Sequence, residues 1–268
     1  MENMTTSEDL LFFPVIGRIY TTERFPAILR DEKALSLKSR LPAHLRDRKL
    51  QNQYAALAGA VRSAEFDRFI RSFLKQNPDG IVVQLGCGLE TTFDRCDNGS
   101  ARWVEVDTAE SMKIRKTVLR EGPRERYFEG DPLSPAWMAE IRVREPQTPV
   151  LVCAAGLLHR FPQDRIEKLL WELQAMGHVE ILFDALNRQG GKRMEGYLPS
   201  GNPAKTAEPF CVDDAAHLAE HLGGDARVLV EDAMFAHADL SGVGFLAKSA
   251  IRKANRGKMM KIVALKLS

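Results

Sequence analysis

The chain has 268 residues, of which 44% are hydrophobic and 28% are charged, and its formal net charge at pH 7 is +2. These values are typical of a soluble globular protein and exclude a disordered, collagen-like or coiled-coil chain. No apolar run reaches the ~18–20 residues that cross a bilayer, and we see no secretory signal. We therefore expect a cytoplasmic protein without a membrane partner.

The N-terminal 60 residues are mixed in character, with helical pieces that Pro14, Pro26 and Pro42 are expected to break. We predict that residues 1–60 form a helical lid that covers the substrate, and that residues 61–268 form one Rossmann-like domain. Residues 64–75 have apolar side chains at helical spacing, and a turn over residues 77–80 ends this helix.

From there the chain alternates between predicted strands and helices. Seven segments are predicted as strands, most of them apolar throughout: 81–85, 102–106, 126–128, 150–153, 179–183, 227–230 and 261–267. The helices predicted between them are 108–120, 163–176, 213–222 and 243–253. Residues 184–212 show no clear hydrophobic periodicity of a helix or a strand, which indicates an excursion from the domain. The alternation predicts a largely parallel sheet covered on both faces.

Cysteine usage and charge distribution narrow the possible partners. The four cysteines form no CxxC pair and have no zinc-like spacing, so we expect reduced thiols and no metal site. The segment that begins at Lys248 and runs to the last residue contains seven basic residues, Lys248 included, and no acidic one. Because no aromatic residues interleave with these charges, we interpret this end as a solvated helix face and expect no nucleic-acid partner.

A strand followed by Gly86-Cys87-Gly88 allows close approach of a ligand to the backbone. Asp107 ends the next predicted strand, 21 residues after Gly86, where an acid can accept both hydroxyls of a ribose. Thr91 stands where a dinucleotide fingerprint has its third glycine, and this favours S-adenosylmethionine over NAD. An NAD-dependent oxidoreductase uses the same geometry and is the alternative at this point.

The residues around this turn carry a family resemblance. Residues 83–95 read VQLGCGLETTFDR and residues 103–107 read WVEVD. They resemble the signature of the leucine carboxyl methyltransferase family, and more closely its bacterial branch, the tetracenomycin-type polyketide O-methyltransferases. Residues 13–18 and 28–34 resemble two upstream motifs of the family, and residues 156–159 resemble a downstream strand end.

The resemblance covers roughly residues 10–190 and implies a class I S-adenosylmethionine-dependent methyltransferase fold, which is Rossmann-like with a mostly parallel seven-stranded sheet. It implies O-methylation of a small-molecule acceptor, at a carboxylate or a hydroxyl. It also implies that Arg62 grips the carboxylate of the cofactor, that Asp107 binds the ribose, and that Asp131 accepts from the adenine amino group. The expected cofactor-binding residues are Arg62, Gly86, Gly88, Asp107, Asp131 and Pro132.

Three further residues bear on the reaction. Ala154 stands where the family often has Glu, so a non-catalytic descendant that binds S-adenosylmethionine is a second alternative. His159 follows the fourth predicted strand and is the candidate base for a hydroxyl acceptor, whereas a carboxylate needs none. Arg18 is expected to face the acceptor and to attract an anionic group.

Overall fold

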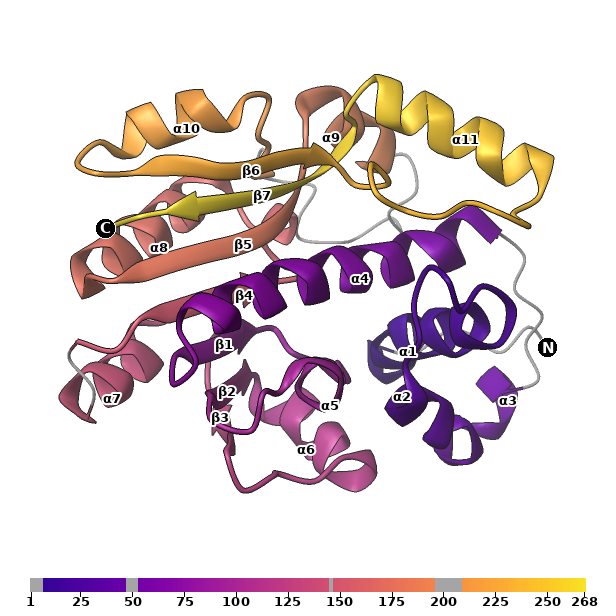
Figure 1. Cartoon of the computed structure of the whole chain (residues 1–268), viewed down its shortest axis with the longest axis horizontal. Helices are drawn as coiled ribbons and strands as arrows, with labels where there is room; N and C mark the ends of the chain where they lie inside the picture. The colour runs from indigo at the N-terminus through magenta and orange to yellow at the C-terminus, as the bar shows by residue number, and fades with distance from the viewer. Residues whose placement is uncertain (1–6, 47–52, 145–146, 196–208) are drawn as a thin grey trace.

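The structure is a computed structural model that describes residues 7–46, 53–144, 147–195 and 209–268 (Figure 1). Its centre is a seven-stranded sheet in the order β3-β2-β1-β4-β5-β7-β6. The strands are β1 Ile81–Leu85, β2 Arg102–Asp107, β3 Glu125–Glu129, β4 Val150–Ala154, β5 Val179–Leu186, β6 Arg227–Ala233 and β7 Met260–Lys266. Strands β1 to β5 run parallel, while β7 is antiparallel to both β5 and β6. The expected mostly parallel sheet is therefore confirmed.

Helices cover both faces of the sheet because alternate strand residues point to opposite sides. On β1, Ile81, Val83 and Leu85 belong to one apolar cluster, and Val82 belongs to the other. The first cluster is closed by α7 Ala136–Arg144, α8 Gln163–Met176 and α10 Ala215–Leu222. The second is closed by α4 Gln53–Gln76, α5 Thr92–Cys96 and α11 Phe245–Arg256.

The N-terminal segment forms a third apolar cluster beside the sheet. It consists of α1 Ser7–Arg24, α2 Glu32–Ser36, η1 Lys38–Arg40 and α3 Ala43–Arg46, and it packs on α6 Ala109–Val118. Pro14 lies inside α1, so the expected break there is wrong. Proline removes one helical hydrogen bond, but the buried residues Val15 and Ile19 continue the helix into the cluster.

Two expected boundaries differ from the structure. The border between residues 60 and 61 falls inside α4, which is one continuous helix, because Ala60 and Val61 face the second apolar cluster along with its C-terminal half. Residues 184–186 belong to β5, and α9 Arg188–Glu195 follows, so the start of the expected excursion is wrong. Residues 196–208 of that excursion lie outside the described residues.

All four cysteines lie in the described part of the chain, where none of them forms a disulfide and three of them are buried. None of the helices in the described ranges is long and apolar enough to cross a membrane.

Candidate functional site

The turn after β1, residues 86–90, is called the glycine loop below. Gly86 and Gly88 have φ angles of 61° and 46°, which favour glycine. A Cβ on Gly86 would lie 2.8 Å from Leu157 Cδ1, so no side chain fits there without movement. The Gly86 amide donates to the Val106 carbonyl at 2.8 Å. These contacts hold the loop at the carboxyl edge of β1 and β2.

Asp107 ends β2 directly beside this loop, as the sequence predicts. Its Oδ2 accepts from the Gly88 amide at 2.8 Å, and its Oδ1 accepts from the Thr108 amide at 2.7 Å. The side chain of Thr108 in turn caps α6. Asp107 is buried, and each carboxylate oxygen keeps a further acceptor position. The carboxylate is therefore fixed by the backbone and still able to accept from a ligand.

Arg62 reaches the same sheet edge from the middle of α4. Its Nη1 donates to Asp184 Oδ2 at 3.3 Å, and its buried Nε has no hydrogen-bond partner among the described residues. A Cβ on Gly156 would lie 2.6 Å from Arg62 Nη1, so the guanidinium lies against the backbone after β4. Arg62 thus has donor capacity left for a carboxylate.

Asp184 on β5 is a site residue that the sequence reasoning missed. Its Oδ1 accepts from the Gly156 amide at 2.5 Å. Burial by itself raises the pKa of Asp184. Arg62, His159 and the Gly156 amide together lower it by more than burial raises it, so the pKa lies below its usual value. The carboxylate is therefore ionised at neutral pH. The signal in the sequence is weak: β5 contains two acids, Glu180 and Asp184, and Asp184 follows the apolar residues 181–183.

His159 lies in η2 Leu158–Arg160, which follows β4. Its Nδ1 is buried without a hydrogen-bond partner among the described residues. Burial lowers the pKa of His159 below its usual value, helped by the charges of Arg160 and Arg62 and opposed by Asp184. The imidazole is therefore neutral at pH 7 and able to take up a proton.

Ala154 is fully buried in the first apolar cluster and pairs with Phe183 of β5. A carboxylate at this position would be placed among apolar side chains. The carboxylate that contacts Arg62 at this edge comes from Asp184 instead.

Asp131 and Pro132 follow β3, at the next strand end. Asp131 accepts from the Leu133 amide at 2.9 Å and from Arg165 at 3.1 Å, and half of its side chain is exposed. Pro132 is buried, and its carbonyl accepts from the indole of Trp137 at 3.2 Å. Both residues lie on the sheet edge that carries Asp107, and their contact with adenine stays a prediction.

Arg18 does not face an acceptor, which corrects the expectation from the sequence. Its side chain is buried, and its Nε donates to Asp31 at 3.0 Å. Its two terminal nitrogens donate to the Glu90 carboxylate and to the Leu89 carbonyl. Because every nitrogen has a partner inside the protein, Arg18 ties α1 to the glycine loop.

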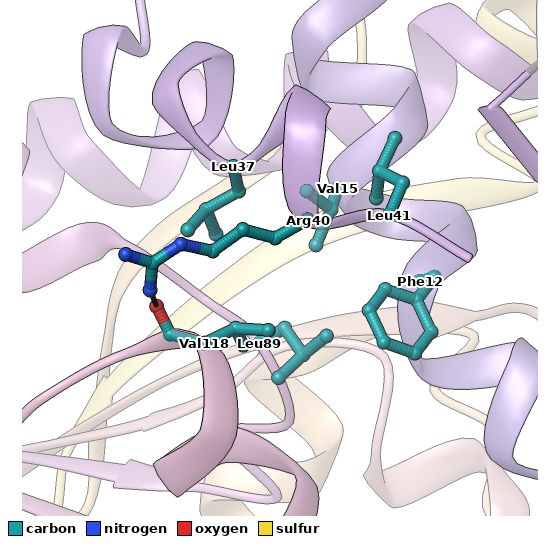
Figure 2. Close-up of a pocket in the computed structure, with 7 residues that line it drawn as sticks. All are labelled: Phe12, Val15, Leu37, Arg40, Leu41, Leu89 and Val118. Carbon is teal, nitrogen blue, oxygen red and sulfur yellow. Dashed lines mark hydrogen bonds between the residues drawn. The ribbon is translucent and has the colours of Figure 1, made fainter. Parts of the chain in front are cut away.

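A pocket lies where the N-terminal helices meet the body of the protein (Figure 2). Arg40 crosses it and donates from Nη1 to the Val118 carbonyl at 3.1 Å. The residues that line it are Phe12, Val15, Leu37, Arg40, Leu41, Leu89 and Val118. Six of these seven side chains are apolar, so the pocket is a gap between packed apolar side chains and has few groups that could bind a polar ligand.

Comparison with protein families and with individual relatives identifies similar sequences. The family model described as Leucine carboxyl methyltransferase matches residues 14–174. The tetracenomycin polyketide synthesis O-methyltransferase TcmP of Streptomyces glaucescens is 25% identical over 127 residues, which are 47% of this chain and 46% of that protein. The alignment thus spans about half the length of this relative.

Solved structures resemble the whole chain at low identity. A DUF574 family protein from Streptomyces avermitilis has a TM-score of 0.60 at 14% identity, covering 94% of this chain and 96% of that one. Magnesium protoporphyrin IX methyltransferase from Synechocystis PCC 6803, solved with bound SAH, has a TM-score of 0.51 at 12% identity, covering 94% and 98%. These likenesses confirm the expected class I methyltransferase fold.

Proposed function

Since this chain belongs to the leucine carboxyl methyltransferase family, we propose that it transfers a methyl group from S-adenosylmethionine to an oxygen atom of a small-molecule acceptor. The observation that carries the proposal is the Asp107 carboxylate, held by the amides of Gly88 and Thr108 beside the glycine loop. Neither nucleic acid nor NAD is part of this proposal.

The residues at the sheet edge fit the cofactor in three respects. Leu157 closes the space that a side chain on Gly86 would need, which suits a ligand lying against bare backbone. Asp107 has acceptor positions for ribose hydroxyls. The unpartnered Nε of Arg62 suits the carboxylate of the methionine moiety, because a guanidinium binds a carboxylate through two parallel bonds. Asp131 with Pro132 is the proposed adenine end.

When bound, S-adenosylmethionine supplies a methyl group that is activated by a positively charged sulfur. The work left to the protein is to align the acceptor and to exclude water. Asp184 keeps Arg62 against Gly156 and so orients the carboxylate grip. The neutral His159 takes the proton from a hydroxyl acceptor, and the nearby Asp184 carboxylate stabilises the resulting imidazolium.

Isothermal titration calorimetry tests the cofactor assignment directly. We expect S-adenosylmethionine and S-adenosylhomocysteine to bind with micromolar affinity, about −8 kcal/mol, and NAD to bind far more weakly. The Asp107→Ala variant should weaken S-adenosylhomocysteine binding by about 1–3 kcal/mol, because ribose hydroxyls would be left unpaired. The matched control is Asp79→Ala, an exposed aspartate before β1 at the opposite sheet edge, which should bind like the wild type.

Two results would contradict the proposal. One is binding of NAD without any response to the two methionine-derived ligands. The other is a folded Asp107→Ala variant, with an unchanged melting temperature, that binds S-adenosylhomocysteine as tightly as the wild type.

A further inference from the structure

A buried arginine holds the glycine loop from behind. Arg115 of α6 is 2% exposed. Its Nη1 donates to the carbonyl of Gly88 at 3.1 Å and to the carbonyl of Glu90 at 2.8 Å. A hydrogen bond from a charged donor is stronger than a neutral one, so this one nitrogen fixes the backbone on both sides of Leu89.

The opposite side of the guanidinium is held by the sheet. Nη2 of Arg115 donates to Glu125 on β3 at 3.1 Å and lies 3.6 Å from Glu105 on β2. The guanidinium carbon lies 4.8 Å from the ring centre of Tyr127. Arg115 therefore bridges the loop and two strands, with carboxylates on one side and carbonyls on the other.

Gly88 connects this arginine to the cofactor site. Its carbonyl accepts from Arg115, while its amide donates to Asp107 at 2.8 Å. A shift of the guanidinium therefore changes the position of the donor that orients the Asp107 carboxylate.

We propose that Arg115 is a positioning residue for the cofactor, fixing the glycine loop so that Asp107 keeps its ligand-accepting geometry. This inference rests on the proposed function for the identity of the ligand. The proposed role requires an arginine at position 115, because one planar group must reach two loop carbonyls and a carboxylate at once. Lysine, a compact charge on a flexible stem, cannot reproduce this fork.

Calorimetric titration with S-adenosylhomocysteine tests the role of Arg115 in the Arg115→Lys variant. Each titration gives the dissociation constant and the fraction of binding-competent protein. We expect the dissociation constant to rise about tenfold or more, because charge-assisted bonds to the loop are lost, while the melting temperature reports the loss of stability separately. The matched control is Arg142→Lys, because Arg142 of α7 also donates to two backbone carbonyls, those of Thr148 and Gly177, far from the glycine loop. It should lower the melting temperature and leave the dissociation constant unchanged.

The outcomes separate the two proposals. A purely structural role for Arg115 would reduce the binding-competent fraction and leave the dissociation constant of the remainder unchanged, and this result would overturn the inference. If Arg115→Lys does not fold, the Glu125→Gln variant is titrated in its place. This substitution weakens the contact that holds the Arg115 guanidinium to the sheet, so the dissociation constant should rise several-fold. An unchanged dissociation constant would overturn the inference. Absence of binding by the wild type would instead refute the proposed function.

Discussion

Glu105 is a buried carboxyl with no hydrogen-bond partner for either oxygen among the described residues. Burial raises the pKa of Glu105 to about 7, against the lowering effect of Arg115 and with a further rise from Glu125. Because the pKa in the folded state lies above that of the unfolded chain, the folded state favours the protonated form. The contribution of Glu105 to the free energy of unfolding is therefore fully present below about pH 4.5, and it is lost as the pH rises through about 7.

The size of this effect follows from the shift. A change of pKa from 4.5 to about 7, at about 1.4 kcal/mol per unit, amounts to about 3 kcal/mol of unfolding free energy. The Glu105→Gln variant keeps the shape of the protonated side chain and cannot ionise. The wild type should therefore lose about 3 kcal/mol relative to Glu105→Gln between about pH 4.5 and about pH 8.5.

Urea denaturation of both proteins over this pH range measures the difference. The titration of groups that do not interact with Glu105 is common to the two proteins and cancels in the comparison, provided that the dependence on urea concentration is the same. A difference that stays constant with pH would refute the reasoning, because it would mean that Glu105 has the same pKa in the folded and the unfolded chain.

Two further substitutions test the proposed site. Arg62→Ala should weaken S-adenosylhomocysteine binding about tenfold or more in calorimetry, because a charge-assisted bond to a carboxylate is lost. It should leave methylthioadenosine, which lacks that carboxylate, nearly unaffected, and equal losses for both ligands would exclude the grip. His159→Ala should slow methylation of a hydroxyl acceptor by about 100-fold and leave a carboxylate acceptor unaffected. Because burial lowers the pKa of His159, the wild-type rate with a hydroxyl should persist to below pH 6.5; a midpoint above that value would contradict the role as base.

Local pattern was enough to predict the sheet and to place Gly86 and Asp107 at the same edge of it. An apolar run bounded by turn residues predicted β1, and apolar residues at helical spacing predicted α8, both with the bounds that the structure has. The spacing of Gly86 and Asp107 placed both at one sheet edge, because the carboxyl ends of parallel strands meet there. These features depend on periodicity and chain direction, which the sequence contains directly.

The features that were missed depend on tertiary contacts. The first half of α4 is rich in alanine, so the hydrophobicity of its buried face differs little from that of its exposed face. Arg18 reads as a surface charge until Asp31 and Glu90 are brought to it from other segments. Asp184 extends an apolar strand, and only the approach of Arg62 from α4 gives it a role. Partners far apart in sequence leave no local signal.

The ion pairs of Asp31 limit how members of this family can be recombined. Its carboxylate accepts from Arg18 of α1, and also from Arg95 at 2.7 Å and Thr91 at 2.6 Å in the segment after the glycine loop. A chimera whose N-terminal segment lacks an acid at this position would leave the buried Arg95 without one of its three carboxylate partners, with Asp67 and Glu90 remaining, at a cost of several kcal/mol. Grafting of that segment therefore requires both sides of this charge network to be transplanted together.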